Sequence, residues 1–357
     1  MMRGVVRYLR RNPSLALGTV LLAALALFVV IGGMLVDIED ARPLSAPTLR
    51  PPSWEYPFGT DRQGRDLLAV MIAGTPLTLR IGFIAGFLGV GIGTVLAFIA
   101  AYYRGLLDTV IRGIADIGLT VPGLLVLIII AVSLKGTLTV NQMAIVVASL
   151  AWLYPTRTIR AQVLSLRERG YVEVARLSGM SGPAIIFFEL MPNLLPYLAA
   201  TLVNAVSAAI LASIGLEVLG LGPIDAPTLG MTLYWVNFNA AMINGWWWWW
   251  AAPTVIIVTV FLGLFFLTVG LDEIANPRLR IAGRGRAARR GRPYVPARTL
   301  GRHEAARLHR HRDLPAPEGH YRRRADQRAR CRDAAASHGD PRPGAAGIGR
   351  GGHSDRA

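Results

Sequence analysis

"RERGYVEVARLSGMSGPAIIFFELMPNLLPYL", residues 167–198, is the stretch of this sequence that decides the fold. Residues Tyr171–Gly179 have the pattern of a helix of about two turns that a glycine ends, because glycine readily adopts the left-handed conformation of a C-cap. Ser181–Pro183 then begins a second piece, since proline is favoured in the first turn of a helix. The stretch predicts a helix–glycine–helix elbow, a shape that another protein could bind.

The chain around this elbow has the composition of an all-α, polytopic membrane protein. Of its 357 residues, 53% are hydrophobic and only 17% are charged. The apolar residues gather in runs of about 20, the length a helix needs to cross the roughly 30 Å hydrocarbon core. We expect each run to be a helix, because backbone polar groups in lipid must be satisfied internally. The six expected spans are 15–36, 77–103, 114–134, 141–161, 195–219 and 252–271.

The basic residues between the spans predict their orientation. The first apolar run exceeds the 7–15-residue core of a signal peptide, so we interpret it as an uncleaved first span. The loop 37–76 holds six acidic residues against four arginines, and 223–250 holds a single charge, Asp225. Arginines gather instead at the N-terminus, around Arg112, in 160–176 and at 278–280. Both termini are therefore expected in the cytoplasm, because cytoplasmic loops carry the excess of basic residues.

The chain divides into four regions by these patterns. They are the N-terminus with the first span (1–36), an extracytoplasmic segment (37–76), a helical core (77–280) with the elbow at about 165–195, and a tail (281–357). The tail holds 19 of the 38 basic residues, and Arg, Gly, Ala and Pro dominate it. It has too few large apolar residues to bury a core, so we expect it to be disordered. One hypothesis is that a shifted or extended reading frame encodes it.

The single lysine and the single cysteine argue against two features: a phosphate-binding loop and an intramolecular disulfide. Lys135 is the only lysine, and it follows Leu134, whereas a phosphate-binding loop needs a glycine before its lysine. The chain is therefore not expected to bind ATP through that motif. Cys331 is the only cysteine, so an intramolecular disulfide is excluded.

The elbow resembles the cytoplasmic loop signature of binding-protein-dependent ABC importer permeases. That signature is Glu-Ala-Ala, three residues, Gly, nine residues, then Ile-x-Leu-Pro. Here it stands as Glu173-Val174-Ala175, Gly179 and Glu189-Leu190-Met191-Pro192. Val174, Glu189 and Met191 depart from the signature, but the glycine and the proline keep their spacing.

Three further stretches resemble the dipeptide/oligopeptide/nickel permeases, specifically the subunit with the long N-terminal extension. They are "FGTDRQGRDLLAVMIAGTPLTLRIG" (58–82), "ILASIGLEVLGLGPIDAPTLGMTL" (210–233) and "LDEIANPRLR" (271–280). The resemblance covers roughly 1–280. Chains of that family normally end near the last of these motifs, so the tail is not explained by it.

The resemblance implies a type I ABC importer permease in a bacterial inner membrane. Two such permeases form a channel for peptides or a related small solute, and an extracytoplasmic binding protein delivers the solute. Two cytoplasmic ATPases carry ATP and Mg, so this chain binds no cofactor and is not itself an enzyme. ATP binding closes the ATPases, and the elbow passes that motion to a bundle that alternates access.

The resemblance also assigns residues of the elbow. Glu173, Ala175 and Gly179 are expected at the ATPase contact, with Arg176, Met180 and Ser181 beside them. Tyr171 and Val172 are expected to form the inner packing face.

Two carboxylates lie within the expected spans, where an ionisable group is costly and is a candidate for function. Glu217 is the candidate for the translocation path, with a structural pair or a place at the outer end as the alternatives. Asp116 lies close to the cytoplasmic Arg112 and is placed at the interface. Pro122 and Pro155 are expected to kink their helices.

Five consecutive tryptophans, Trp246–Trp250, precede the last span. Successive helical residues point about 100° apart, so five rings in a row do not form one stacking platform for a ligand. Tryptophan favours the membrane–water interface. We interpret the run as an interfacial collar, with some rings toward lipid and others toward a partner permease or a docked binding protein.

Two other functions stay open at this point. An ion-gradient-driven secondary transporter would also be polytopic, but no internal repeat of the six spans and no cluster of intramembrane carboxylates is evident. A membrane anchor that binds anionic lipid or nucleic acid through the tail is the third alternative. Only Tyr294 and Tyr321 interleave the tail's arginines, so nucleic acid is not an expected partner. Membrane lipid is an expected partner because the chain is polytopic.

Overall fold

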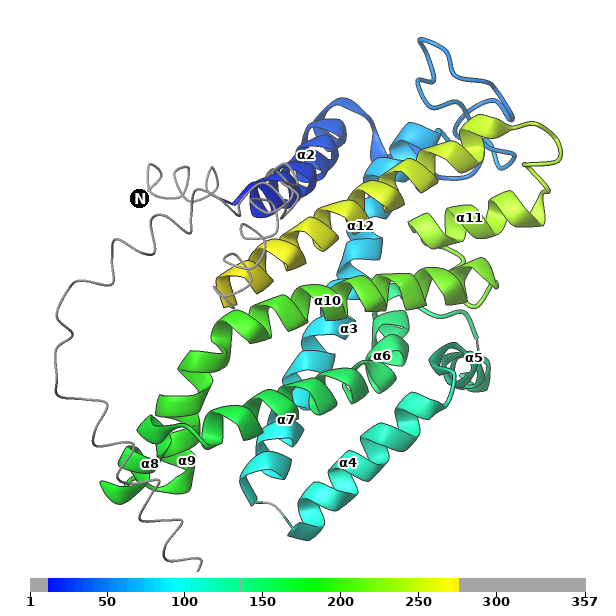
Figure 1. Ribbon diagram of the computed structural model, residues 1–357. Helices are drawn as coiled ribbons and strands as arrows, with labels where there is room; N and C mark the ends of the chain where they lie inside the picture. Colours follow the sequence, from blue (N-terminus) through cyan, green and yellow to red (C-terminus); the bar gives the residue numbers. More distant parts are fainter. Residues whose placement is uncertain (1–11, 104, 135, 276–357) are drawn as a thin grey trace, which may run out of the picture. The chain divides into compact units, whose positions relative to one another are not determined.

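A computed structural model describes residues 12–103, 105–134 and 136–275, and every structural statement below concerns these residues. The N-terminal arginines, the 278–280 motif, Cys331 and the predicted disordered tail lie outside them. The described part consists of helices and loops, without a strand (Figure 1).

The first half contains α2 (Pro13–Leu35), the short 3-10 helix η1 (Ile38–Ala41), α3 (Leu67–Tyr103), α4 (Gly105–Thr120), α5 (Gly123–Ser133) and α6 (Val140–Ala151). The second half contains α7 (Leu153–Arg167), α8 (Gly170–Leu177), α9 (Gly182–Ala184), the π-helical turn η2 (Ile185–Leu190), α10 (Met191–Val218), α11 (Leu229–Phe238) and α12 (Trp247–Ala275).

Four helices are long and apolar enough to cross a membrane: Pro13–Leu35, Leu67–Tyr103, Gly182–Val218 and Trp247–Glu273. They correspond to the first, second, fifth and sixth expected spans. A fifth crossing is possible if α4 and α5 together make one span. The third and fourth expected spans, 114–134 and 141–161, are not continuous helices.

Prolines account for both interruptions. The axes of α4 and α5 differ by 90°, and Pro122 lies at the break, where it disfavours helical backbone at the residue before it. Pro155 lies in the first turn of α7. It has no N–H to donate to the carbonyl of Ala151, and its ring clashes with that carbonyl. The chain therefore breaks at Trp152, so the interruption caused by Pro155 lies three residues before it.

The second span begins ten residues earlier than expected, at Leu67. Asp66 precedes the helix, and its Oδ1 accepts the N–H of Leu68 at 3.0 Å, which satisfies a free donor of the first turn. The segment expected at 37–76 therefore ends at Asp66. Its last ten residues read as loop in the sequence because they contain Gly74 and Pro76.

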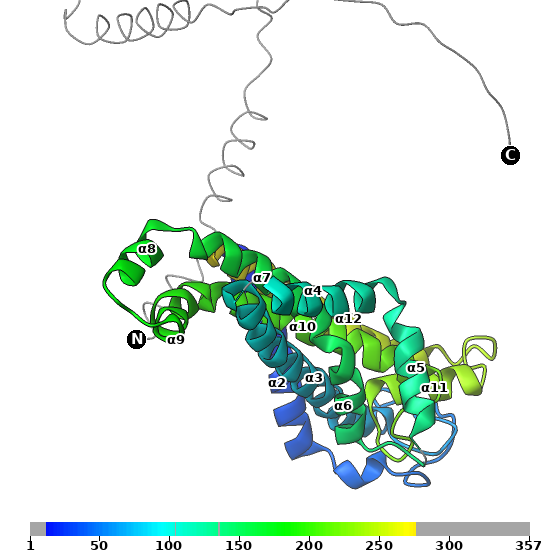
Figure 2. The same ribbon diagram turned by 90° about the horizontal axis from the view of Figure 1, so that it is seen from below.

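The helix α3 is the central column of the bundle (Figures 1 and 2). It packs along α10 on one side and along α6 and α7 on another, while α12 packs on α2 and α10. Glycines allow these close approaches. A Cβ at Gly86 would lie 2.8 Å from the backbone N of Val206, and a Cβ at Gly89 would lie 2.7 Å from the carbonyl O of Ala151. The small residues spaced four apart in α3 thus pack within the chain.

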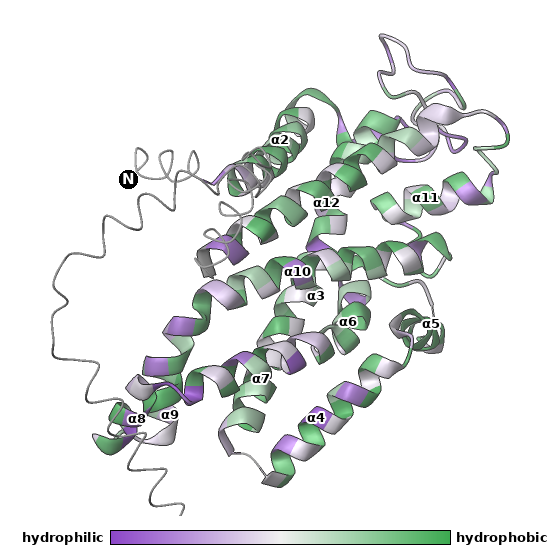
Figure 3. Cartoon of the chain, viewed as in Figure 1, coloured by the Kyte–Doolittle hydropathy of each residue, from purple (hydrophilic) through white to green (hydrophobic). Residues whose placement is uncertain are grey.

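The bundle has two different ends. The end that carries α8 and α9 is called the elbow end here, and the end that carries residues 36–66, 219–228 and 239–246 is called the loop end. Figure 3 shows hydrophilic residues at the elbow end and along α4, whereas α2 and α12 are mainly hydrophobic.

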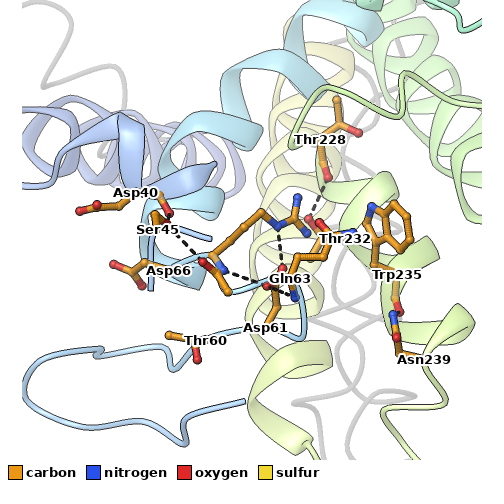
Figure 4. Close-up of polar contacts among 12 residues, drawn as sticks. Asp40, Ser45, Thr60, Asp61, Gln63, Asp66, Thr228, Thr232, Trp235 and Asn239 are labelled. Carbon is orange, nitrogen blue, oxygen red and sulfur yellow. Dashed lines mark hydrogen bonds and ion pairs between the residues drawn. The ribbon is translucent and has the colours of Figure 1, made fainter. Parts of the chain in front are cut away.

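A polar network connects residues of the loop end (Figure 4). Asp61 and Arg65 are both buried and form an ion pair, with Nε 2.6 Å from Oδ2. The other carboxylate oxygen of Asp61 accepts the N–H groups of Gln63 and Arg65 at 2.8 and 3.0 Å. Gly64 between them has a φ of 70°, where glycine is favoured. The sequence "DRQGRD" therefore forms a closed turn that leads directly into α3.

The tryptophan run faces its own chain more than expected. Trp249 is fully buried, and Trp248 donates its indole N–H to the carbonyl of Thr60 at 3.2 Å. Trp247 is 57% exposed. Residues before α3 thus cover part of the predicted collar, a long-range contact that helical periodicity does not reveal.

Candidate functional site: the elbow

The first helix of the elbow, α8, ends in the hydrogen-bond pattern that its glycine predicts. Gly179 has a φ of 81°. Its N–H donates to the carbonyl of Arg176 at 3.1 Å, and the N–H of Met180 donates to the carbonyl of Ala175 at 3.2 Å. These two bonds define the Schellman C-cap. The predicted helix, glycine stop and second helical piece are all present.

The elbow is tied to the end of α3. The Nη1 group of Arg167 donates to the carbonyls of Ala101 and Tyr102 at 2.7 and 2.9 Å. A cation is favourable at this place because the last carbonyls of a helix carry partial negative charge. On the other limb, a Cβ at Gly182 would lie 2.2 Å from the hydroxyl O of Tyr102, so glycine permits that contact. Both limbs therefore contact the same turn of α3.

One face of α8 is buried against the bundle. Val172 and Ala175 are 1% and 7% exposed, and they join a cluster with Ile159, Val163 and Ile185. The positions 172 and 175 are three residues apart and share a helix face. The inward face is therefore short and apolar.

The opposite face of the elbow projects away from the bundle. Four residues predicted at the ATPase contact are exposed: Glu173, Arg176, Gly179 and Ser181. Ala175 and Met180 point inward instead, and Met180 is partly buried against the same cluster as Ala175. The inward place of Ala175 follows from its helical spacing from Val172, which makes the alanine a packing residue in this chain.

Tyr171, predicted on the inner face, is 37% exposed. Partial burial raises the pKa of its phenol, the nearby Arg169 opposes that shift, and Glu189 adds to it. The ring thus lies at the edge of the elbow, about 100° around α8 from Val172.

Two apolar residues of the outward face were not predicted from the sequence. Val174 and Leu177 are 63% and 82% exposed. Their spacing of three residues is a signal for a second apolar stripe. Phe187 and Phe188 of η2 are also exposed, at 64% and 73%. Exposed apolar side chains beside Glu173 and Arg176 are typical of a surface that another protein covers.

The contacts of Glu217 are those of a structural residue, one of the alternatives to a place in the translocation path. It lies at the last turn of α10 and is fully buried. Its Oε2 accepts the hydroxyl of Thr228 at 2.6 Å and the N–H of Met231 at 3.1 Å. Thr228 is the N-cap of α11, where a negative charge is favourable. These bonds connect the end of α10 to the start of α11, which is the structural role, and the place of Glu217 in the translocation path stays a prediction.

Asp116 lies on α4 opposite α7. Its Oδ1 is 3.7 Å from Nε of Arg157, and the two side chains are 46% and 64% exposed. Asp108, two turns earlier on α4, forms a closer pair with Arg160. The two carboxylates of α4 thus face basic residues of α7.

A bundle of long apolar helices with an exposed elbow anchored at one end defines a multi-pass membrane protein. The sequence profile of the binding-protein-dependent transport system inner membrane component family matches residues 89–281. The chain belongs to this family, and it is a membrane permease of an ABC importer.

Curated relatives support this family assignment. The dipeptide transport system permease of Haemophilus influenzae is 31% identical over 63% of this chain and 78% of its own length. A peptide transport system permease of Brucella suis is 30% identical over 78% of this chain and 92% of its own length. The oligopeptide transport system permease of Mycobacterium tuberculosis is 29% identical over 64% and 77%, respectively.

Proposed function

We propose that this chain is one of two homologous permease subunits that form the path of a peptide importer in a bacterial inner membrane. The names of the three relatives support peptides as the substrate class. The elbow end faces the cytoplasm, and α4–α5 and α6–α7 complete six crossings with both termini inside. ATP and Mg bind to two partner ATPases, and the loop end receives the extracytoplasmic binding protein.

The observation that carries this proposal is the two-sided elbow. Val172 and Ala175 hold α8 to the bundle, while Glu173, Val174 and Leu177 are exposed. Residues 182–218 form one continuous helical segment from the elbow through the bundle. When a cleft on an ATPase takes the outward face, a movement of the ATPase passes to α10 directly and to α3 through Arg167. Alternating access follows from that rigid connection.

Co-purification and uptake test the proposal together. The chain is expressed together with the second permease and the two ATPases of its transport system, and labelled dialanine uptake is measured with the binding protein present. Glu173→Lys reverses a charge of the outward face, and Gly179→Pro is incompatible with a φ of 81°. Both variants are expected to reach the membrane, to lose the ATPases and to lose uptake.

Two variants elsewhere serve as controls. Glu55→Lys makes the same charge reversal at the loop end, and Gly136→Pro changes another exposed glycine of positive φ. Both should keep the ATPases. If Glu173→Lys and Gly179→Pro also retain the ATPases and uptake, the elbow is not the coupling site.

A further inference from the structure

A hollow lies away from the elbow, among three parts of the bundle. It has a volume of about 820 Å³. Leu119, Gly123 and Leu124 line it from α4 and α5, Ala151 and Tyr154 line it from α6 and α7, and Asn204 faces it from α10. The remaining lining residues are apolar or small, and none is charged.

Both interrupted helices meet at this hollow. Leu119 and Gly123 flank the break between α4 and α5, and Ala151 and Tyr154 flank the break at Trp152. Irregular backbone at membrane depth is tolerated only where protein buries it or where it lines a water-filled cavity. Discontinuous helices also form substrate sites in other membrane transporters. The two breaks therefore indicate that this hollow faces water or substrate rather than lipid.

Asn204 provides independent support. It lies in the middle of α10, thirteen residues after Met191 and fourteen before Val218, and it is exposed. Neighbouring hydroxyls of α10 bond to carbonyls of their own helix: Thr201 to Tyr197, Ser207 to Val203 and Ser213 to Ile210. No such bond satisfies the amide of Asn204 in the described part of the chain. An amide facing lipid at this depth is costly.

We propose that Asn204, together with the hydroxyl of Tyr154, contacts the peptide during its passage through the hollow. Tyr154 is 60% exposed, and its hydroxyl also has no hydrogen-bond partner among the described residues. An asparagine amide both donates and accepts hydrogen bonds, as the peptide backbone does. It therefore recognises the part that all peptides share. Small wall residues such as Ala205, Ala208 and Gly215 leave room for different side chains.

This inference rests on the proposed function, but its first test needs no transport. Because Cys331 is the only cysteine, Cys331→Ser gives a cysteine-free background. Asn204→Cys is introduced there, and the assembled transporter is treated with a charged, membrane-impermeant methanethiosulfonate reagent. Leu27→Cys is the control, because Leu27 is 57% exposed on the first span and lines no cavity described here.

We expect Asn204→Cys to react at least about tenfold faster than Leu27→Cys, since only a thiol in contact with water ionises and reacts readily. Equal, slow reaction of both would show that position 204 faces lipid or a dry subunit interface, and would overturn the inference. That result would leave the elbow tests unaffected.

Uptake tests the contact itself. Asn204→Leu and Tyr154→Phe should each lower labelled dialanine uptake by roughly three- to tenfold, the effect of one lost hydrogen bond. Asn204→Gln, which keeps the amide, should retain more uptake than Asn204→Leu. The ATPases should co-purify with all three variants. Wild-type uptake by Asn204→Leu would overturn the proposed contact, whereas absent dialanine uptake by the wild type would contradict the proposed function instead.

Discussion

The carboxylate of Glu217 accepts two hydrogen bonds at the start of α11, one from Thr228 and one from Met231. A Cβ at Gly230 would lie 2.3 Å from Oε2 of this glutamate, so the surrounding backbone is packed closely on it. We expect Glu217→Ala to lower the free energy of unfolding by about 2 kcal/mol, because buried donors lose their acceptor. Thermal denaturation of the purified permease in detergent would measure this loss.

Glu217→Gln separates the acceptor from its charge. The glutamine keeps an oxygen for Thr228 and Met231, so the loss of stability should be smaller than for Glu217→Ala. Glu55→Ala, an exposed carboxylate of the loop end, should have little effect. If Glu217→Ala is as stable as the wild type but loses uptake, Glu217 serves transport. That result would agree with its predicted place in the translocation path.

The glycines of α3 set its distance from α10. A Cβ at Gly86 would approach the backbone of Val206, whereas a Cβ at Gly91 would meet nothing within 4 Å. Gly86→Ala should therefore lower the free energy of unfolding by about 1–3 kcal/mol. Gly91→Ala should be neutral or stabilising by up to about 1 kcal/mol, because alanine favours helix. Equal thermal stability of the two variants would refute this packing.

The two faces of α8 predict opposite phenotypes. Leu177 is 82% exposed and Val172 is 1% exposed. Leu177→Ser should leave thermal stability unchanged and weaken co-purification of the ATPases. Val172→Ser should instead lower the melting temperature, since it places a hydroxyl in an apolar cluster. The assignment of the faces fails if Leu177→Ser destabilises the permease and Val172→Ser does not.

For the whole molecule, the sequence predicted the local features well and the long-range ones poorly. Four apolar spans and the glycine stop at Gly179 depend on hydropathy and local backbone preference, and both were confirmed. The contact that covers Trp248 depends on a distant part of the chain, whereas the break at Trp152 and the inward position of Ala175 follow from nearby residues, Pro155 and Val172. Helical spacing from Val172 could have placed Ala175, but no local signal indicates that Trp248 would bond to Thr60.

The tail is expected to be dispensable for transport. The family profile ends at residue 281, and the match to the Brucella suis relative covers 78% of this chain. The predicted disorder of 281–357 also leaves it without a core of its own. A chain truncated after Arg280 should therefore insert normally, retain the ATPases and take up labelled dialanine at the wild-type rate. A chain truncated after Gly245 is the control, and it should fail because it lacks α12, which packs on α2 and α10. Loss of uptake by the first truncation, with normal insertion, would show that the tail contributes to transport and would contradict its origin from a shifted reading frame.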